Sequence, residues 1–257
     1  MVFHIGDLVT RKSYQHDVVF KILNIKGEVA YLKGVQVRLY ADAPLEDLEL
    51  FVEEDRAIDE DEVIIDEDLT RDDFFYLPGK VLHIDADGDY LERCMKFYKK
   101  NRVMAVGKKL EESEVPKQIK SLLIDYQPDI VIITGHDAYY PKKGGIADIK
   151  NYRNTEYFVK AVKEARKVEK SHEKLVIIAG ACQSNYEELI KAGANFASSP
   201  KRINIHALDP AIIATVLAMS ERNKEIDLVS LLEKTKYGAN GMGGIISNGM
   251  MYVGFPR

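Results

Sequence analysis

Two continuous apolar runs, Asp129-Ile130-Val131-Ile132-Ile133-Thr134 and Leu175-Val176-Ile177-Ile178-Ala179, decide the fold class of this chain. A strand that is apolar throughout is covered on both faces, which is typical of a parallel sheet with helices on each side. Between the two runs lies a stretch whose apolar residues recur at helical spacing: Phe158, Val162, Ala165 and Val168. Together these features predict an α/β domain built on a parallel sheet.

Alternating strands and helices of the same kind extend from residue 79 towards the end of the chain. Further strands are expected at residues 80–85, 102–107 and 195–198. Two further helices are expected where apolar residues recur at helical spacing: Tyr90, Cys94, Phe97 and Tyr98 in the first, and Val115, Ile119, Leu122 and Tyr126 in the second. Asn248-Gly249 lies between two apolar runs and predicts a closing β-hairpin, because a type I′ turn needs positive φ at both positions.

The first 52 residues differ from the rest in their sequence pattern. Residues 7–11, 18–23, 29–32, 35–40 and 48–52 form short runs, most of them rich in β-branched and aromatic residues. Turn signals such as Lys26-Gly27 and Lys33-Gly34 separate several of them. These runs predict an SH3-like β-barrel over residues 1–52. An acidic connector over residues 53–78 and the α/β domain over residues 79–257 complete the expected organisation.

The net charge of −5 is distributed unevenly along the chain. Twelve acidic residues lie between Glu53 and Asp73, together with only two basic residues, Arg56 and Arg71. This composition is typical of a solvated connector, and the alternative is a tether or mask for basic partners. No cluster of lysine and arginine interleaved with aromatic residues occurs elsewhere, so no nucleic-acid partner is expected.

Several features indicate the compartment. No run of about 18 apolar residues exists, so no membrane span is expected. The first residues lack the basic and apolar segments of a signal peptide. Two cysteines in 257 residues do not make a disulfide framework, and they favour a reducing compartment. We therefore expect a cytoplasmic protein.

Reactive side chains follow three of the expected strands. In open parallel sheets, catalytic groups gather beyond the carboxyl ends of the strands. Asp85 ends the first strand and Asp87 comes just after it, His136 follows the third strand and Cys182 follows the fourth. A cysteine is only slightly ionised at neutral pH, but a nearby imidazole favours the thiolate and then protonates the leaving amine. The pattern predicts that His136 and Cys182 form the catalytic dyad of a cysteine endopeptidase, with backbone N–H groups at Gly135 and Cys182 as oxyanion donors.

The residues assigned to the active site also have other interpretations. A cysteine that ends an apolar strand is often a core residue, as Cys94 is expected to be on its helix. A non-enzymatic alternative is a flavodoxin-like or receiver-like module that binds a small ligand or Mg²⁺ through Asp85 and Asp87. In that case Cys182 is incidental. No cofactor or resident metal is expected for the peptidase.

A second histidine and carboxylate also lie close together in the sequence. His206 and Asp209 are an alternative acid–base pair, and His206 is an alternative to His136 as the working histidine. A structural role is favoured, because Asp209-Pro210 resembles the N-cap and first residue of a helix over residues 211–219. A zinc site of Cys182, His206 and Asp209 lacks the close spacing of zinc motifs.

The order of the two residues, with Ala181-Cys182-Gln183 at the nucleophile, resembles the caspase-like group of cysteine peptidases, whose histidine lies about 50 residues upstream. Three segments resemble the YabG family of sporulation-specific peptidases more closely: Ile133-Thr134-Gly135-His136-Asp137, Ala179-Gly180-Ala181-Cys182-Gln183-Ser184-Asn185 and Asn204-Ile205-His206-Ala207-Leu208-Asp209-Pro210. The likeness covers nearly the whole chain. It implies a caspase-like catalytic domain and the processing of spore coat and related proteins in the mother cell.

Two positions depart from the caspase-like pattern. In that pattern glycine directly follows the histidine and its N–H serves the oxyanion, whereas here Asp137 follows and Gly135 precedes. Ser184 stands where the nucleophile signature has glycine. These departures leave undecided which N–H groups bind the oxyanion.

The resemblance also suggests a specificity pocket. In caspase-like peptidases the loop after the first strand helps to line the pocket for the residue before the cut. Asp85, Asp87 and Asp89 stand in that loop, so the resemblance implies an arginine bound by a bidentate carboxylate contact. The alternative is a solvated acidic turn.

Overall fold

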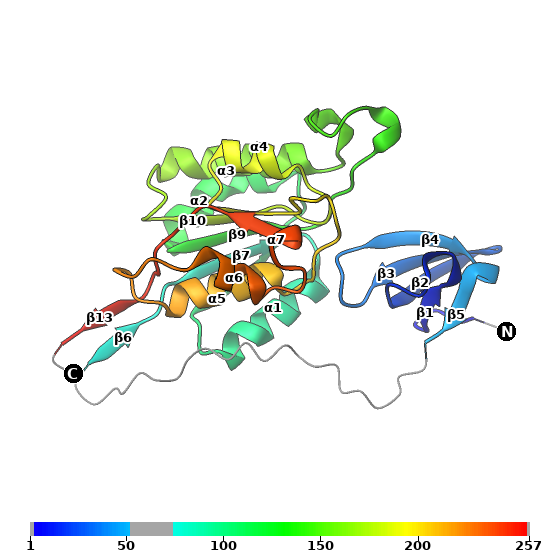
Figure 1. Cartoon of the computed structure of the whole chain (residues 1–257), viewed down its shortest axis with the longest axis horizontal. Helices are drawn as coiled ribbons and strands as arrows, with labels where there is room; N and C mark the ends of the chain where they lie inside the picture. Colours follow the sequence, from blue (N-terminus) through cyan, green and yellow to red (C-terminus); the bar gives the residue numbers. More distant parts are fainter. Residues whose placement is uncertain (1–2, 52–73, 256–257) are drawn as a thin grey trace. The chain divides into compact units, whose positions relative to one another are not determined.

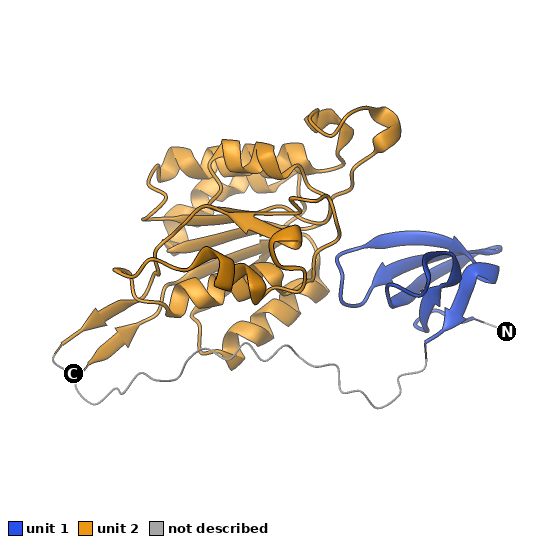
Figure 2. Cartoon of the chain, viewed as in Figure 1, with its two compact units in different colours: residues 1–62 blue, residues 63–257 orange. Residues whose placement is uncertain are grey.

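The computed structural model describes residues 3–51 and 74–255, and the chain divides into two compact units, residues 1–62 and 63–257 (Figure 2). Most of the expected acidic connector, with Arg56 and Arg71, lies outside the described residues. Each unit has a hydrophobic core of its own.

Unit 1 is a five-stranded antiparallel sheet in the order β4-β3-β2-β1-β5. Its strands are β1 (Leu8–Arg11), β2 (Phe20–Lys26), β3 (Val29–Gly34), β4 (Tyr40–Pro44) and β5 (Leu48–Leu50), with short 3₁₀ turns η1 (Lys12–Tyr14) and η2 (Leu45–Asp47). Side chains alternate across the pleat, and Phe20, Ile22 and Leu32 are buried in the core. The expectation of an antiparallel, strand-rich N-terminal unit is confirmed.

The fourth strand of unit 1 lies further along the chain than residues 35–40. Residues 35–39 form a loop, in which the Gly34 N–H donates to the Leu39 carbonyl at 2.7 Å. A Cβ on Gly34 would lie 2.4 Å from the Val37 carbonyl oxygen, so the chain turns back tightly on itself here. Pairing with β3 starts only at Tyr40. The prediction from β-propensity was wrong because strand pairing overrides propensity.

Unit 2 is built on a six-stranded sheet in the order β12-β11-β10-β9-β7-β8. The strands are β7 (Val81–Asp85), β8 (Ala105–Lys109), β9 (Ile130–Thr134), β10 (Val176–Ala179), β11 (Phe196–Ser198) and β12 (Met242–Gly244). Every neighbouring pair is parallel except β11 and β12. All residues of β7, β9 and β10 are buried, as the apolar runs predicted.

Helices cover both faces of this sheet (Figure 1). On one face lie α2 (Val115–Tyr126), α3 (Thr155–Val168) and α4 (Tyr186–Ala192), and on the other α1 (Gly88–Lys100), α5 (Asp209–Met219) and α6 (Leu228–Glu233). The short α7 (Gly238–Gly241) leads into β12, and η3 (Pro141–Lys143) and η4 (Ile149–Asn151) lie in the green excursion between β9 and α3. The predicted α/β architecture is confirmed. Within the described ranges no helix has the length and hydrophobicity needed to cross a bilayer.

Strand β8 starts at Ala105, later than the expected residue 102. Arg102 takes a left-handed φ of 56°, and the Val103 N–H donates to the Tyr98 carbonyl at 2.9 Å. These residues close the end of α1 before the strand begins.

The expected β-hairpin at Asn248-Gly249 is not formed. Instead β12 pairs with β11, and β13 (Tyr252–Gly254) pairs with β6 (Phe75–Leu77). Gly249 does not occupy the left-handed region, and a Cβ there would lie 2.1 Å from the Ser220 carbonyl oxygen. The glycine allows a close approach between two distant segments, so the turn prediction was wrong.

Candidate active site

Cys182 and His136 follow two strands that are paired in the sheet. In the parallel ladder of β9 and β10, Ile133 is the partner of Ala179. His136 and Cys182 each lie three residues beyond this pair. Equal offsets from one register place both residues beyond the same edge of the sheet, at the carboxyl ends of the strands.

A carboxylate from the next strand lies beside the histidine. Asp85, the last residue of β7, is paired with Thr134, and Asp87 and His136 each lie two residues beyond this pair. The Nε2 atom of His136 lies 3.2 Å from Oδ2 of Asp87. Oδ1 of Asp87 accepts two backbone N–H groups at the start of α1 and caps that helix. The contact with His136 was not predicted from the sequence, although equal offsets from a paired register are a signal that could have revealed it.

Asp85 is buried at the end of β7. Its Oδ1 accepts a hydrogen bond from the Asp87 N–H at 2.9 Å, and Nε2 of His83 lies 3.8 Å from its Oδ2. Asp85 and Asp87, the two residues expected to bind substrate, therefore both lie at the carboxyl end of β7 and are joined by this hydrogen bond from the Asp87 N–H.

Cys182 lies in the turn between β10 and α4. Its side chain belongs to a buried cluster that includes Ile205 and Leu208, and its Sγ accepts a hydrogen bond from the Ile205 N–H at 3.3 Å. An N–H directed at sulfur stabilises negative charge on it. The next residue, Gln183, takes a left-handed φ of 58°, so the chain turns sharply after the cysteine.

Backbone N–H groups at and beside His136 and Cys182 are engaged within the protein. The His136 N–H donates to Oε1 of Glu112 at 2.7 Å, and the Ala181 N–H donates to Oγ of Ser184 at 2.9 Å. A Cβ on Gly135 would lie 2.5 Å from the same Glu112 oxygen, which explains the glycine at this position. Glu112 was not predicted to contact this site, because it lies in the loop before α2 and matches no sequence pattern.

Asp137, directly after His136, is buried and accepts four hydrogen bonds. Two backbone N–H groups donate to Oδ1, and the hydroxyls of Thr155 and Ser184 donate to Oδ2. Burial raises the pKa of Asp137 above its ordinary value of 3.8, although the four hydrogen bonds act in the opposite direction.

His206 and Asp209 bind backbone groups around the start of α5. Leu208, not Asp209, is the N-cap of this helix. The Asp209 carboxylate accepts the N–H groups of His206 and Lys236, each at 2.9 Å. Nδ1 of His206 accepts the Leu208 N–H at 3.3 Å. Among the residues the structure describes, no three His, Cys, Asp or Glu side chains form a potential metal site, so Cys182, His206 and Asp209 do not make one.

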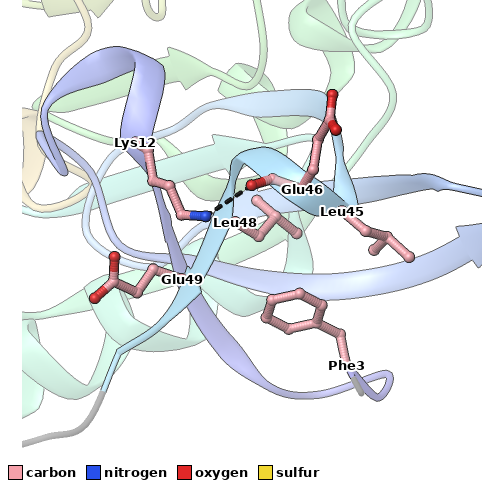
Figure 3. Close-up of a pocket in the computed structure, with 6 residues that line it drawn as sticks. All are labelled: Phe3, Lys12, Leu45, Glu46, Leu48 and Glu49. Atoms are coloured by element: carbon pink, nitrogen blue, oxygen red, sulfur yellow. Dashed lines mark hydrogen bonds between the residues drawn. The ribbon is translucent and has the colours of Figure 1, made fainter. Parts of the chain in front are cut away.

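Unit 1 has a surface hollow of its own, lined by Phe3, Lys12, Leu45, Glu46, Leu48 and Glu49 (Figure 3). Lys12 Nζ donates to the Glu46 carbonyl at 2.7 Å across it. This lining contains no cysteine, serine or histidine, so it does not offer a nucleophile beside a general base.

The geometry defines an α/β protein whose reactive side chains gather beyond the carboxyl ends of adjacent parallel strands. The chain belongs to the YabG peptidase family, because the family model described as YabG peptidase U57 matches residues 4–68 and 57–256. It is also 41% identical over 286 residues to the sporulation-specific protease YabG of Bacillus subtilis (strain 168), and the match covers 100% of this chain and 99% of that protein. The predicted family is confirmed, and membership makes the chain a peptidase.

Proposed function

We propose that this chain is a cysteine endopeptidase with Cys182 as nucleophile and His136 as general acid and base. The observation that carries the proposal is the equal three-residue offset of the two residues from the Ala179–Ile133 pair. The position of Cys182 at a sharp turn between a strand and a helix also supports it. Membership of a peptidase family favours this function over the alternative of a Mg²⁺-binding or ligand-binding module.

In the proposed reaction, the Cys182 thiolate attacks the carbonyl carbon of the scissile bond and forms a C–S bond. The N–H groups of Gly135 and Cys182 hold the resulting oxyanion. The C–N bond then breaks, and the departing amine takes a proton from His136. Water attacks the thioester and gives a proton to His136, and cleavage of the C–S bond releases the new carboxyl group and restores the thiolate.

The role of Asp87 in this scheme is to orient the histidine. Its Oδ2 lies 3.2 Å from Nε2 of His136, and its other oxygen is fixed by the start of α1. With Nε2 directed at Asp87, proton exchange with the nucleophile and the amine uses Nδ1.

We also propose that Asp85 and Asp87 bind an arginine that precedes the cut. Asp85 ends β7 and Asp87 lies two residues beyond it, and β7 is paired with β9, the strand that precedes His136. Burial of Asp85 argues against the alternative of a solvated acidic turn. A guanidinium group suits a site with two carboxylates because it presents several N–H donors in a fixed plane.

Three further proposals concern the fold of each unit and the natural substrates. We propose a caspase-like catalytic domain, supported by the helix-covered sheet with the dyad at the ends of β9 and β10. An SH3-like barrel is supported by the five-stranded antiparallel sheet of unit 1. We also propose spore coat and related sporulation proteins as substrates, in the mother-cell cytoplasm. The description of the relative as a sporulation-specific protease supports a role in sporulation.

The deciding experiment compares the wild type with Cys182→Ala, His136→Ala and Cys94→Ala on an arginine-containing peptide library. We expect the first two variants to lose at least about 10³-fold in kcat. Cys94→Ala is the matched control, because Cys94 is the other cysteine of the chain and lies on the buried side of α1. Hydrolysis retained by Cys182→Ala would refute the nucleophile assignment.

A further inference from the structure

One buried carboxylate connects the loop of His136 with the turn of Cys182. Oδ2 of Asp137 accepts hydrogen bonds from the Ser184 hydroxyl, at 2.8 Å, and from the Thr155 hydroxyl. Asp137 directly follows His136, Ser184 lies two residues after Cys182, and Thr155 is the first residue of α3. Both hydroxyl residues are fully buried, so water does not compete for these hydrogen bonds.

Both hydroxyls also bind the backbone of the Cys182 turn. Ser184 Oγ accepts the Ala181 N–H at 2.9 Å, and Thr155 Oγ1 accepts the Asn185 N–H at 3.1 Å. The turn over residues 181–185 is therefore linked, on each side of Cys182, to a single carboxylate.

The same carboxylate binds the histidine loop. Its Oδ1 accepts the N–H groups of Ala138 and Asn154 at 2.9 and 2.8 Å. The side-chain amide of Asn154 in turn donates to the His136 carbonyl at 2.8 Å. With four donors on its two oxygens, the Asp137 carboxylate has filled its capacity as an acceptor.

We propose that Asp137 is a positioning residue that, through Ser184 and Thr155, holds the Cys182 turn in place relative to His136. In this role Asp137 does not contact substrate. The inference rests on the dyad proposed above, because only a reaction that uses both side chains depends on the spacing of their loops. A misplacement of about 1 Å between reacting groups can cost about 100-fold in rate, so loss of these hydrogen bonds affects kcat more than KM.

Conservative substitutions separate the effect of losing a hydroxyl group of this network from the effect of changing the side-chain volume. Thr155→Val removes the hydroxyl and keeps the side-chain shape, whereas Thr155→Ser keeps the hydroxyl. Ser184→Ala removes the other hydroxyl. Its matched control is Ser198→Ala, because Ser198 is an equally buried serine at the end of β11 whose hydroxyl contacts a methionine sulfur instead. All variants are made in the Cys94→Ala background, so that Cys182 is the remaining thiol.

Four quantities are measured for each variant: kcat and KM on an arginyl peptide, the pH profile of Cys182 alkylation by iodoacetamide, and Tm. We expect kcat to fall about 10- to 100-fold in Thr155→Val and Ser184→Ala, with KM nearly unchanged. We also expect their alkylation profiles to move towards that of an isolated thiol. Thr155→Ser and Ser198→Ala should match the background.

The outcomes separate this inference from the dyad itself. The positioning role would be overturned if both Thr155→Val and Ser184→Ala had the kcat and the alkylation profile of the Cys94→Ala background. If Cys182→Ala were inactive at the same time, the dyad would remain intact. A fall of kcat that merely follows Tm, or an equal fall in Ser198→Ala, would also overturn it. Activity of Cys182→Ala equal to the background would overturn the dyad and the positioning role together.

Discussion

Asp137 Oδ2 and Ser184 Oγ lie 2.8 Å apart and form a hydrogen bond between the loops that carry His136 and Cys182. These are the two positions at which the chain departs from the caspase-like pattern, which has glycine at each. A buried carboxylate needs donors, and the serine hydroxyl supplies one, so the two departures form a single structural feature.

The raised pKa of Asp137 predicts a pH dependence of stability. Because burial raises the pKa above 3.8, the folded state holds the proton more tightly than the unfolded state. The contribution of this group to the free energy of unfolding is therefore full below the ordinary pKa and is lost as pH rises through the folded value. Asp137→Asn does not titrate, so we expect the wild type to lose stability relative to this variant across that window.

The measurement is urea unfolding at a series of pH values, followed by helical circular dichroism. Within the described residues every α-helix lies in unit 2, so this signal reports on the unit that contains Asp137. Parallel stability curves for the two proteins would contradict the prediction.

Asp87→Asn should impair turnover without unfolding α1. Asparagine caps helices as well as aspartate does, but it removes the negative charge 3.2 Å from Nε2 of His136. We expect kcat to fall about 10- to 100-fold for arginyl and citrullyl substrates alike, because the orientation of His136 serves both. An effect confined to KM for the arginyl substrate would instead assign Asp87 to substrate binding alone.

Asp85→Asn tests the proposed arginine pocket. Citrulline has nearly the shape of arginine but no charge, so a carboxylate pocket should distinguish the two. We expect the wild type to prefer the arginyl substrate in kcat/KM, and Asp85→Asn to lose about 10-fold or more of that preference. An unchanged preference would remove Asp85 from the pocket.

Arg166 of α3 is expected to stabilise unit 2 by joining three segments. Its Nε donates to the Gly193 carbonyl at 2.7 Å, its Nη1 to the Leu175 carbonyl at 2.9 Å and its Nη2 to Oδ1 of Asn195 at 2.6 Å. Burial lowers the pKa of Arg166 to about 10, so it remains charged at neutral pH. Arg166→Ala should lower the free energy of unfolding by roughly 2–4 kcal/mol, because it removes three hydrogen bonds donated by a charged group.

The control for this stability measurement is Lys163→Ala, an exposed position on the same helix. We expect a change within about 0.5 kcal/mol there. Similar losses in both variants would mean that the contacts of Arg166 contribute little.

Gly249→Ala should destabilise unit 2 although its backbone is not left-handed. The added Cβ would lie 2.1 Å from the Ser220 carbonyl oxygen. This oxygen belongs to the backbone, so it can move only if the chain around Ser220 moves. We expect a loss of roughly 1–3 kcal/mol, measured as a fall in Tm. The matched change is Gly145→Ala, where nothing lies within 4 Å of the added Cβ, and a similar fall there would contradict the steric explanation.

Secondary structure was predictable where burial alone decides it. Strands β7, β9 and β10 followed from apolar runs, and helix α1 followed from the spacing of Tyr90 and Cys94. The predictions failed where partners distant in the sequence decide. Residues 35–39 have strand propensity but lie in a loop, and Asn248-Gly249 has a turn sequence but packs against Ser220.

The helix-covered parallel sheet, and the position of His136 and Cys182 after two of its strands, were predictable from the order of the residues alone. Continuous apolar strands are stable only when both faces are covered, and parallel strands deliver the residues that follow them to one edge. Which loop residues meet at that edge depends on the folded arrangement of the strands. Asp87 and His136 are 49 positions apart, and Asp137 and Ser184 are 47 apart. Such pairs depend on the register of the strands and have no local pattern in the sequence.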